Sequence, residues 1–200
     1  MILLETVHGS HLYGLATPSS DRDSYQVVDK LGSGRRLRNV KQTIVGDEDK
    51  LVIALTDFMR DADDGNPKAL EAMFSPLATG PLKAMANSYV MNGTAARKHY
   101  HKIIHNFAYL SLQDETLREL LIPVYGEEEK VFTSLGKHAR SDLITKYRRH
   151  SVRLLLNLET GLGSGRFNPV LSEEQKQLVY STAHLPEEDF VTYLLGKLST

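Results

Sequence analysis

The sequence contains no cysteine, little net charge and no long apolar run. Its 200 residues include no Cys, which excludes disulfide bonds and metal sites built on thiolates. The formal net charge of −1 argues against a generally basic coat for nucleic acid, although balanced totals can conceal a local patch. No apolar stretch approaches the roughly 20 residues that a membrane span needs, and the start, MILLETVHGSHLYG, is unlike a secretory leader. We therefore expect a soluble, cytoplasmic protein with no membrane partner.

The chain does contain two successive kinds of pattern. Its 41% hydrophobic content is enough for one compact body. Up to about residue 55, short apolar runs predict strands: ILLETV, SYQVV and, after a basic loop KLGSGRRLRNVK, KLVIAL. Apolar residues then recur at helical spacing, in particular at 88–121, 141–162 and 186–198. We expect an α+β fold, with a small mixed sheet and flanking helices in residues 1–75 and a helical region in residues 76–200.

Two glycine-containing segments predict breaks between helices. Gly65-Asn66-Pro67 is typical of a place where one helix ends and the next begins, because Gly ends helices and Pro starts them. A functional alternative would place Asn66 and Glu71 beside a substrate, but the structural interpretation is favoured and Glu71 is not included in the predicted site. The segment GLGSGRFNP at 161–169 likewise predicts a helix stop and a turn.

The most informative stretch is HGSHLYGLATPSSDRDS, between the first two predicted strands. Asp21 and Asp23 are two residues apart, so both carboxylates project to one side of an extended chain, at the mouth of the turn. Paired carboxylates repel each other unless a cation lies between them, and their hard oxygens suit Mg²⁺, which is commonly shared with substrate phosphates. Gly9 lets the backbone approach closely, and Ser10 offers a hydroxyl and an N–H to a phosphate. This spacing predicts a metal-bridged triphosphate, although a lone Asp-x-Asp after a turn is more often a solvated loop.

The same stretch resembles the active-site signature of the polymerase-beta-like nucleotidyltransferases: Gly-Ser, a further glycine, then Asp-x-Asp. The resemblance implies that Gly9 and Ser10 hold the triphosphate, and that Asp21 and Asp23 join a third acid to bind Mg²⁺, with Mn²⁺ as an alternative. More narrowly, LYGLATPSSDRD, DGNPKALEAMF and HSVRLLLNLETGLGSGRF resemble pieces of predicted bacterial and phage nucleotidyltransferases related to RNA-ligase-associated members. These pieces span residues 12 to 167.

The third acid is assigned from this resemblance. Asp49 lies just before the apolar strand KLVIAL and matches the family's position best. Asp57 has another explanation, because an acid in the first turn of a helix is favoured by the helix dipole. Acidic loops such as GDEDK mostly face solvent, and the family often has an acid where this chain has Ala54, so the local alignment stays open.

A second set of candidates lies in SDLITKYRRHSVRLLLNLE. Lys146, His150 and Arg153 follow one another at spacings of four and three, so they share one helix face. Such a face, directed at the carboxylates, would bind the β- and γ-phosphates of a nucleotide, and the resembling family has a similar pattern. The alternative is a solvated basic face with a core histidine. Two further basic stretches are more typical of solvated surface than of a nucleic-acid interface. They contain Arg97, Lys98, His101, Lys102 and His105 beside Tyr100, and Arg35, Arg36 and Arg38.

The function predicted from these residues is transfer of NMP from an NTP to an acceptor hydroxyl, with release of pyrophosphate. Asp21 and Asp23 would hold the metal ions, and Asp49 would lower the pKa of the acceptor hydroxyl or take its proton. The acceptor stays open between an RNA end, a protein and a small molecule, as do the choice of NTP and the oligomeric state. Two other classes stay open: a catalytically inactive nucleotide-binding module, if no third acid approaches the first two, and a nucleic-acid-binding protein without turnover.

Overall fold

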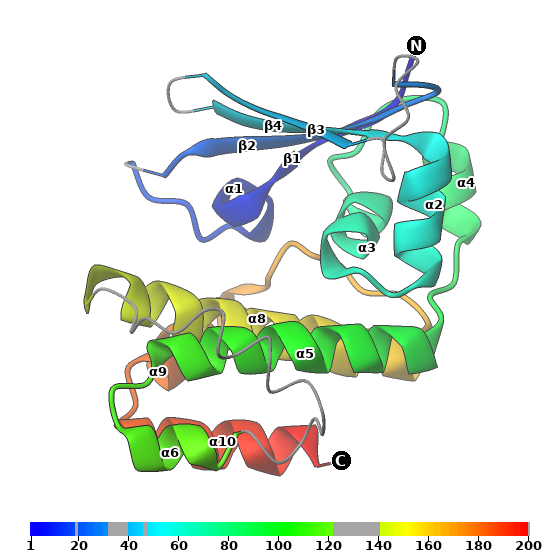
Figure 1. Cartoon of the computed structure of the whole chain (residues 1–200). Coiled ribbons are helices and arrows are strands. Elements are labelled where there is room, and N and C mark those ends of the chain that lie inside the picture. Colours follow the sequence, from blue (N-terminus) through cyan, green and yellow to red (C-terminus); the bar gives the residue numbers. More distant parts are fainter. Residues whose placement is uncertain (19, 32–39, 46–47, 122–140, 200) are drawn as a thin grey trace. The chain divides into compact units, whose positions relative to one another are not determined.

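The computed structural model describes the chain except for residues 19, 32–39, 46–47, 122–140 and 200 (Figure 1). The chain divides into two compact units. The first unit contains residues 1–97 and 160–172, and the second contains residues 98–159 and 173–200. Each unit is therefore built from two segments that are separated in the sequence.

The first unit contains a four-stranded sheet in the order β1-β2-β4-β3 (Figure 1). Strands β1 and β2 are antiparallel, as are β3 and β4, whereas β2 and β4 are parallel. The three strands predicted from the apolar runs are confirmed, and so is the mixed sheet. The strands are Ile2–His8 (β1), Arg22–Val28 (β2), Val40–Val45 (β3) and Glu48–Ala54 (β4).

The sequence pattern does not predict strand β3, because the basic loop KLGSGRRLRNVK includes Lys41. The predicted loop is wrong at its end, since β3 begins at Val40 and pairs with β4 along its whole length. The strand lies at the edge of the sheet, where Lys41, Gln42 and Ile44 are exposed. An edge strand of this kind lacks the continuous apolar run by which the other strands were found.

One face of the sheet is covered by helices and forms the core of the first unit. Residues two apart in a strand share a face. On β1 this face carries Leu4, Thr6 and His8, which are all buried. On β2, Tyr25 packs against Phe58 of the helix that follows β4, with the ring centroids 6.0 Å apart. Figure 1 shows α1 (Gly9–Tyr13), α2 (Leu55–Asp63) and α3 (Pro67–Phe74) on this side of the sheet.

The helices that follow the strands of the first unit confirm the predicted break at Gly65-Asn66-Pro67. Gly65 has a φ of 76°, and a Cβ there would lie 2.3 Å from the backbone nitrogen of Ala96, so only glycine fits. Asn66 caps the next helix, because its side-chain oxygen accepts a hydrogen bond from the Lys68 amide at 3.0 Å. Helices of this unit are Gly9–Tyr13 (α1), Leu55–Asp63 (α2), Pro67–Phe74 (α3) and Lys83–Ser88 (α4).

The second segment of the first unit, residues 160–172, packs against the sheet segment. The Phe167 ring meets the Phe74 ring edge-on, with centroids 5.1 Å apart. The amide of Leu171 donates a hydrogen bond to the carbonyl of Tyr13, at the end of α1, at 3.3 Å. A late part of the sequence therefore completes the surroundings of α1.

The remaining helices mostly follow the predicted helical stretches. Two differences concern helix ends. The stretch at 88–121 is divided, because Asp114 starts a new helix by accepting hydrogen bonds from two amides of its first turn. The stop predicted at 161–169 is confirmed, since α8 ends at Ser164, before Gly165 with its φ of 74°, although the helix continues two residues beyond the predicted stretch 141–162. The helices are Gly93–Ser111 (α5), Glu115–Glu119 (α6), Ser141–Ser164 (α8), Glu173–Ala183 (α9) and Glu187–Leu198 (α10).

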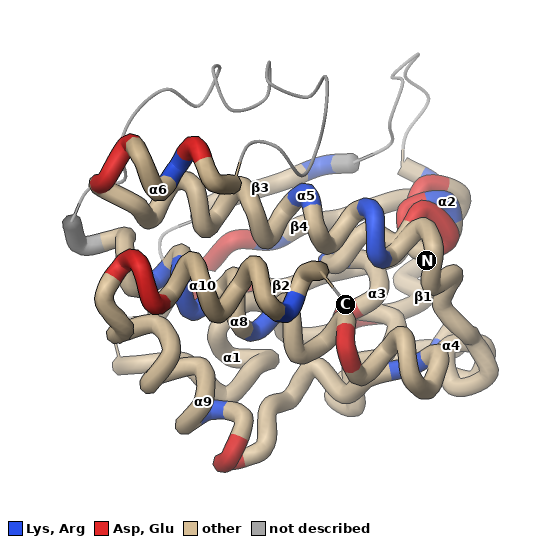
Figure 2. Tube along the Cα trace, turned by 90° about the horizontal axis from the view of Figure 1, so that it is seen from below, with Lys and Arg blue, Asp and Glu red and all other residues tan. Residues whose placement is uncertain are grey.

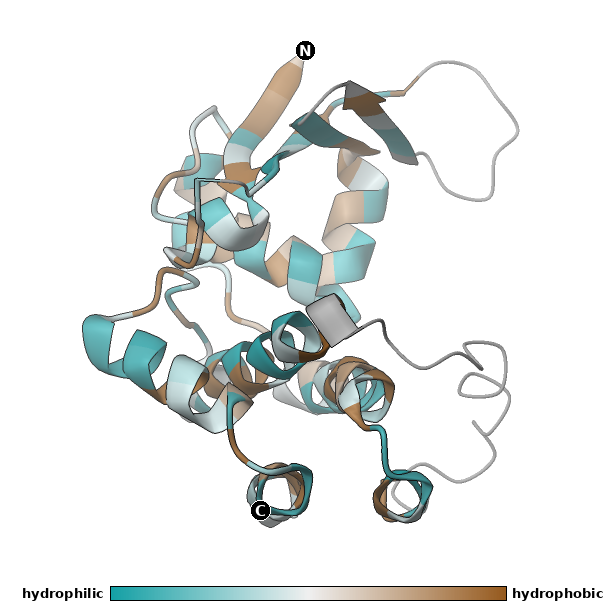
Figure 3. Cartoon of the chain, turned by 90° about the vertical axis from the view of Figure 1, so that its left-hand side faces the viewer, coloured by the Kyte–Doolittle hydropathy of each residue, from teal (hydrophilic) through white to brown (hydrophobic). Residues whose placement is uncertain are grey.

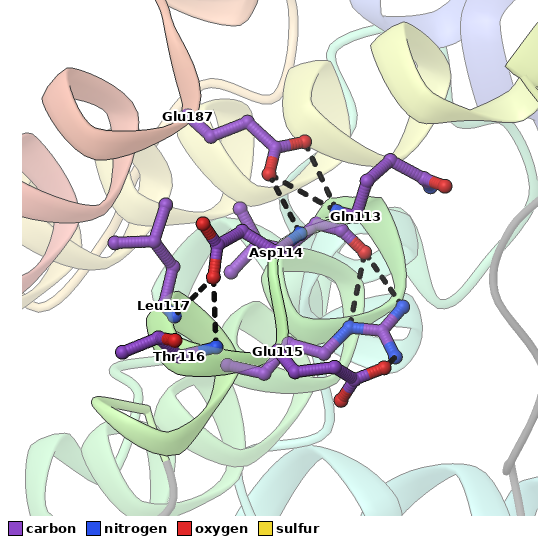
Figure 4. A network of polar contacts seen from close by, with 8 residues as sticks. Gln113, Asp114, Glu115, Thr116, Leu117 and Glu187 are labelled. Carbon is purple, nitrogen blue, oxygen red and sulfur yellow. Dashed lines mark hydrogen bonds and ion pairs between the residues drawn. The ribbon is translucent and has the colours of Figure 1, made fainter.

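A polar network around the partly exposed Glu187 joins helix ends in the second unit (Figure 4). The Glu187 carboxylate accepts hydrogen bonds from the amides of Gln113 and Asp114, at 3.0 to 3.1 Å. It also pairs with Arg148 at 3.2 Å, and Arg148 donates to the Leu185 carbonyl at 2.7 Å. Burial lowers the pKa of Arg148, and Glu187 partly offsets this. The network therefore satisfies two amides at a helix end and two nitrogens of the guanidinium, whereas the buried Nε of Arg148 has no hydrogen-bond partner among the described residues.

Apolar residues of α5, α8 and α10 form the core of the second unit. Ile104, Val152 and Phe190 are fully buried, and Ser151 of α8 donates a hydrogen bond to the Ile104 carbonyl of α5 at 3.2 Å. Figure 3 shows both hydrophobic (brown) and hydrophilic (teal) residues on the helices of the chain, as expected for helices with one buried face. Among the described residues, no helix combines the length and apolarity of a membrane span. The sheet followed by helices confirms the predicted α+β class.

Candidate active site

The register of the sheet places His8, Asp23 and Asp49 side by side on three neighbouring strands. His8 is the Cα partner of Asp23 in the antiparallel pair β1–β2, and Asp23 is the partner of Asp49 in the parallel pair β2–β4. Partners on adjacent strands project to the same face, here the one that the helices cover. Asp23 and Asp49 are each the second residue of their strands, so their carboxylates lie at one end of the sheet.

The Gly9–Ser10 turn lies against the carboxylate of Asp23. Gly9 has a φ of 63°, and a Cβ at this position would lie 1.8 Å from Oδ2 of Asp23 and 2.8 Å from its Cγ. The carboxylate therefore occupies the space that any side chain at residue 9 would need. Ser10 is half-buried in α1, and its carbonyl accepts the Leu15 amide at 2.9 Å. The close backbone approach predicted for Gly9 exists, and the group it approaches is Asp23.

Asp49 has one hydrogen-bonded oxygen and one that is not. Its Oδ2 accepts a hydrogen bond from the Gln42 side chain of β3 at 2.7 Å. Its Oδ1 is buried and has no hydrogen-bond partner among the described residues. An unpaired buried carboxylate oxygen is costly, and hard oxygens of this kind are the ligands that Mg²⁺ takes in proteins. The donor chemistry of Asp49 and Asp23 therefore fits Mg²⁺, although in the described part of the chain no three His, Asp or Glu side chains already form a metal-binding group.

Asp21 lies immediately before β2 and is exposed. It is two residues from Asp23, in the loop that follows α1. Nε2 of His11 in α1 lies 3.4 Å from the carbonyl oxygen of Ser20, so the loop and the helix are in contact next to Asp21. Asp21 is thus the solvent-facing member of the predicted set of acids.

The alternatives to Asp49 lie elsewhere in the unit. Ala54 is the strand partner of Val28, five residues along β4 from Asp49, which is roughly 16 Å at the usual rise of a strand. Asp57 lies in the first turn of α2 and is paired with Arg60, in agreement with its helix-dipole explanation. Figure 2 shows other acidic residues close by on α2. Of the acids considered, Asp49 is the one that the register places beside Asp23.

A buried polar network lies next to the turn, and the predicted site does not include it. Glu71 of α3 is 1% exposed and accepts a hydrogen bond from the Tyr13 hydroxyl at 2.7 Å. Nε2 of His8 lies 3.5 Å from the same carboxylate oxygen, Oε2. The His8 ring also packs beside Tyr25, with centroids 5.7 Å apart. The sequence signal for this network is a single carboxylate within the otherwise apolar run ALEAMF.

The cationic candidates Lys146, His150 and Arg153 all lie on α8, as predicted, in a part of the helix that belongs to the second unit. Their surroundings differ. Lys146 is exposed, His150 stacks on Phe107 with centroids 5.1 Å apart, and Arg153 is 4% exposed. Their binding to a nucleotide stays a prediction.

The two other basic stretches do not form one uniform basic surface in the described chain. His105 of α5 is fully buried, and burial lowers its pKa to about 4, so it is neutral near pH 7. On the same helix Arg97 and Lys98 are exposed. The remaining candidates, Arg35, Arg36 and Arg38, lie outside the described residues.

A glycine–serine turn beside two acids on adjacent strands of a small mixed sheet is the arrangement expected of a polymerase-beta-like nucleotidyltransferase. The chain belongs to the RNA repair pathway DNA polymerase beta family (RlaP), whose model matches residues 1–190. The resemblance predicted from the sequence is therefore confirmed. A comparison with curated proteins finds no match. Membership of this family suggests a nucleotidyltransferase-like role in RNA repair, with a nucleotide as substrate.

Proposed function

We propose that the protein is a Mg²⁺-dependent nucleotidyltransferase that transfers NMP from an NTP to an acceptor hydroxyl. The observation that carries this proposal is the strand register that pairs Asp23 with Asp49, beside a turn whose Gly9 packs on Asp23. Family membership supports it, because it suggests nucleotidyl transfer for the chain as a whole. The proposed site lies within the first unit, and its residues are Gly9, Ser10, Asp21, Asp23 and Asp49.

In the proposed reaction the acceptor oxygen bonds to the α-phosphorus, the bond between that phosphorus and the bridging oxygen to the β-phosphate breaks, and pyrophosphate leaves. When bound, Mg²⁺ would neutralise the phosphates and orient them, and Mn²⁺ could replace it. Asp21, Asp23 and Asp49 would hold the metal, and Asp49 would lower the pKa of the acceptor hydroxyl or take its proton. Ser10 would bind the β- and γ-phosphates through its N–H and hydroxyl.

An RNA end is the acceptor that we propose first, because the family description refers to RNA repair. A terminal 3′ hydroxyl is a nucleophile that can attack the α-phosphorus, and it is the group that we propose. Hydroxyls of a protein or of a small molecule are the alternative acceptors. With either of them, the proposed roles of the site residues stay the same.

The test is a transfer assay with each α-labelled NTP, Mg²⁺ or Mn²⁺, and RNA that ends in either a 3′ hydroxyl or a 3′ deoxy group. We expect label on the hydroxyl-ended RNA alone, with one pyrophosphate released for each NMP added. Asp23→Asn and Asp49→Asn should each lower the rate at least about 100-fold, and Asp49→Asn should spare much of the NTP binding. Asp29→Asn is the matched control, because Asp29 is exposed just after β2, away from the site.

The possible results separate the candidate functions. Label on protein or on a small acceptor would replace RNA but keep the reaction. Mg²⁺-dependent NTP binding with no transfer to any acceptor would identify an inactive nucleotide-binding module. Absence of both binding and transfer, in protein shown to be folded, would overturn the proposal.

The proposed phosphate contacts of Lys146, His150 and Arg153 need a separate test. Lys146→Ala is the cleanest variant, because the side chain is exposed and its removal leaves no buried cavity. If it contacts the β- and γ-phosphates, NTP affinity should fall about 5-fold or more while NMP affinity stays unchanged. Arg149→Ala is the control on the same helix, since Arg149 lies over the ring of Tyr180, 5.6 Å from its centroid. Equal losses for NTP and NMP, or none, would leave Lys146 as a solvated residue.

A further inference from the structure

Glu71 is a charged residue in a helix that otherwise packs apolar side chains. Its neighbours Leu70, Ala72 and Met73 are buried, and Glu71 itself is 1% exposed. Burying a carboxylate is costly unless other groups bind it, and an apolar residue of similar size would pack at this place without that cost. The presence of Glu71 therefore calls for a role that packing alone does not give.

The contacts of Glu71 lie on both sides of the glycine–serine turn. His8, whose Nε2 is 3.5 Å from Glu71 Oε2, directly precedes Gly9. Tyr13, whose hydroxyl donates to the same Oε2 at 2.7 Å, is the last residue of α1, the short helix that begins at Gly9. One carboxylate oxygen thus contacts the residue before the turn and the end of the helix after it.

The position of this short helix also determines how Asp23 is packed. The Asp23 carboxylate lies so close to the Cα of Gly9 that no Cβ fits between them. A five-residue helix has little stability of its own, so its position depends on its tertiary contacts. If α1 shifted, Gly9 would move relative to Asp23, and Ser10 would move with it.

We propose that Glu71 is a positioning residue for the nucleotidyl-transfer site: through Tyr13 and His8 it fixes α1, and thereby the placement of Ser10 and of Asp23. This inference rests on the proposed function, because it assigns Glu71 a task in that same site. Misplacement of a reacting group by about 1 Å can cost up to 100-fold in rate, so turnover is sensitive to a contact of this kind.

The test removes the contact in two ways. Tyr13→Phe deletes only the hydroxyl, and Glu71→Ala deletes the carboxylate, whereas Glu71→Gln keeps an oxygen that can accept from Tyr13. Tyr89→Phe is the matched control: its hydroxyl also donates to a carboxylate, Asp63 Oδ1, at 2.8 Å, but in a part of the first unit that does not contact α1 through this bond. Turnover, KM for NTP, and amide hydrogen exchange are measured at a temperature at which every variant is folded.

We expect Tyr13→Phe and Glu71→Ala to lower kcat about 10-fold, with a change in KM below about 3-fold, because the groups that align the reaction move while most groups that bind NTP remain. Glu71→Gln should stay within about 2-fold of wild type. The amides of Gly14 and Leu15, which both donate to the Ser10 carbonyl, should exchange faster in Tyr13→Phe and remain protected in Tyr89→Phe.

Three results would overturn the inference. If the wild-type protein is active and the Tyr13→Phe and Glu71→Ala variants have the same kcat as Tyr89→Phe, Glu71 has no positioning role. The proposed function would then still stand. Faster exchange in α1 with unchanged kcat would make Glu71 a purely structural residue. A folded wild-type protein that neither binds nor transfers nucleotide would overturn the proposed function, and this inference with it. Should Glu71→Ala fail to fold, the Tyr13→Phe and Glu71→Gln pair decides the question.

Discussion

The charged side chains of the two units have different kinds of partner. In the second unit Arg148 and Glu187 pair with each other and also bind the main chain, because Arg148 donates to a carbonyl and Glu187 accepts from two amides. In the first unit Glu71 is bonded to the side chain of Tyr13, and Asp49 keeps one buried oxygen without a hydrogen-bond partner in the described chain. The comparison teaches that buried charge by itself does not indicate a site. The main-chain partners of Glu187 complete a helix end, whereas Asp49 Oδ1 has no hydrogen-bond partner among the described residues and is left for a ligand.

The largest effect should come from adding a methyl group to the turn of the first unit. Gly9→Ala would force the Asp23 carboxylate away, since the new Cβ would lie 1.8 Å from Oδ2, and it would also hold alanine at a φ of 63°. We expect transfer to fall at least about 100-fold. Gly163→Ala is the control within the same unit, because a Cβ at that position meets nothing within 4 Å. Rates for Gly9→Ala that match this control would contradict the placement of Asp23.

The second effect concerns the network of the second unit. Glu187→Ala would leave two amides and a buried guanidinium without their shared acceptor. We expect the free energy of unfolding to fall by about 3 kcal/mol, measured by urea denaturation. Glu188→Ala removes an exposed neighbouring carboxylate and should change stability by less than about 0.5 kcal/mol. Equal stabilities for the two variants would mean that the Glu187 contacts do not hold the helix ends.

A third effect is acid sensitivity of the second unit. Burial lowers the pKa of His105 to about 4 in the folded state, while the unfolded chain has the usual value near 6.5. As the pH falls from 6.5 to 4, the unfolded state takes up the proton first, so stability is lost over this interval and levels off below it. The loss amounts to about 2 kcal/mol at pH 5. His105→Gln should remove this part of the pH dependence in urea titrations at pH 7 and pH 5, whereas the exposed His184→Gln should not.

The smallest effect should be a gain in stability. Gly196 lies within α10, and a Cβ there meets nothing within 4 Å. Gly196→Ala should therefore stabilise the second unit by roughly 0.5 to 1 kcal/mol, because glycine is a poor helix former. The midpoint of thermal unfolding should be higher for Gly196→Ala than for wild type, and lower for Gly9→Ala, where the structure requires glycine. A midpoint for Gly196→Ala below that of wild type would show that a Cβ at residue 196 does meet neighbouring atoms.

The fold was predictable where local pattern decides the structure. Apolar runs identified β1, β2 and β4, and the sequence Gly65-Asn66-Pro67 identified the boundary of α2 and α3. The edge strand β3 is not predicted, because Val40–Val45 has no continuous apolar run of its own. Pairing with β4 makes this segment extended. The end of α8 lies within the predicted segment 161–169, two residues beyond the helical stretch 141–162, because Gly161 is tolerated inside the helix.

The candidate site was predictable only in part, for a related reason. Gly9, Ser10, Asp21 and Asp23 lie in one short stretch whose spacing carries chemical meaning. Whether Asp49 joins them depends on the register of β2 against β4, a long-range property that no local pattern encodes. The Glu71 network depends in the same way on α3 folding back against β1 and α1. The roles of all these residues stay predictions until the transfer assay is done.

The hydrogen bond from Leu171 to the Tyr13 carbonyl has a consequence for how the protein is made. A ribosome releases the chain from its amino end, so all four strands emerge long before residue 171 does. Until residues 167–171, which follow α8, have been synthesised, the end of α1 lacks the amide of Leu171, and Phe74 lacks the ring of Phe167. A nascent chain halted after residue 97 therefore contains the acids without the segment that completes their surroundings. Nucleotide binding and transfer should therefore become possible only late in translation, after the long helices of the second unit have left the ribosome.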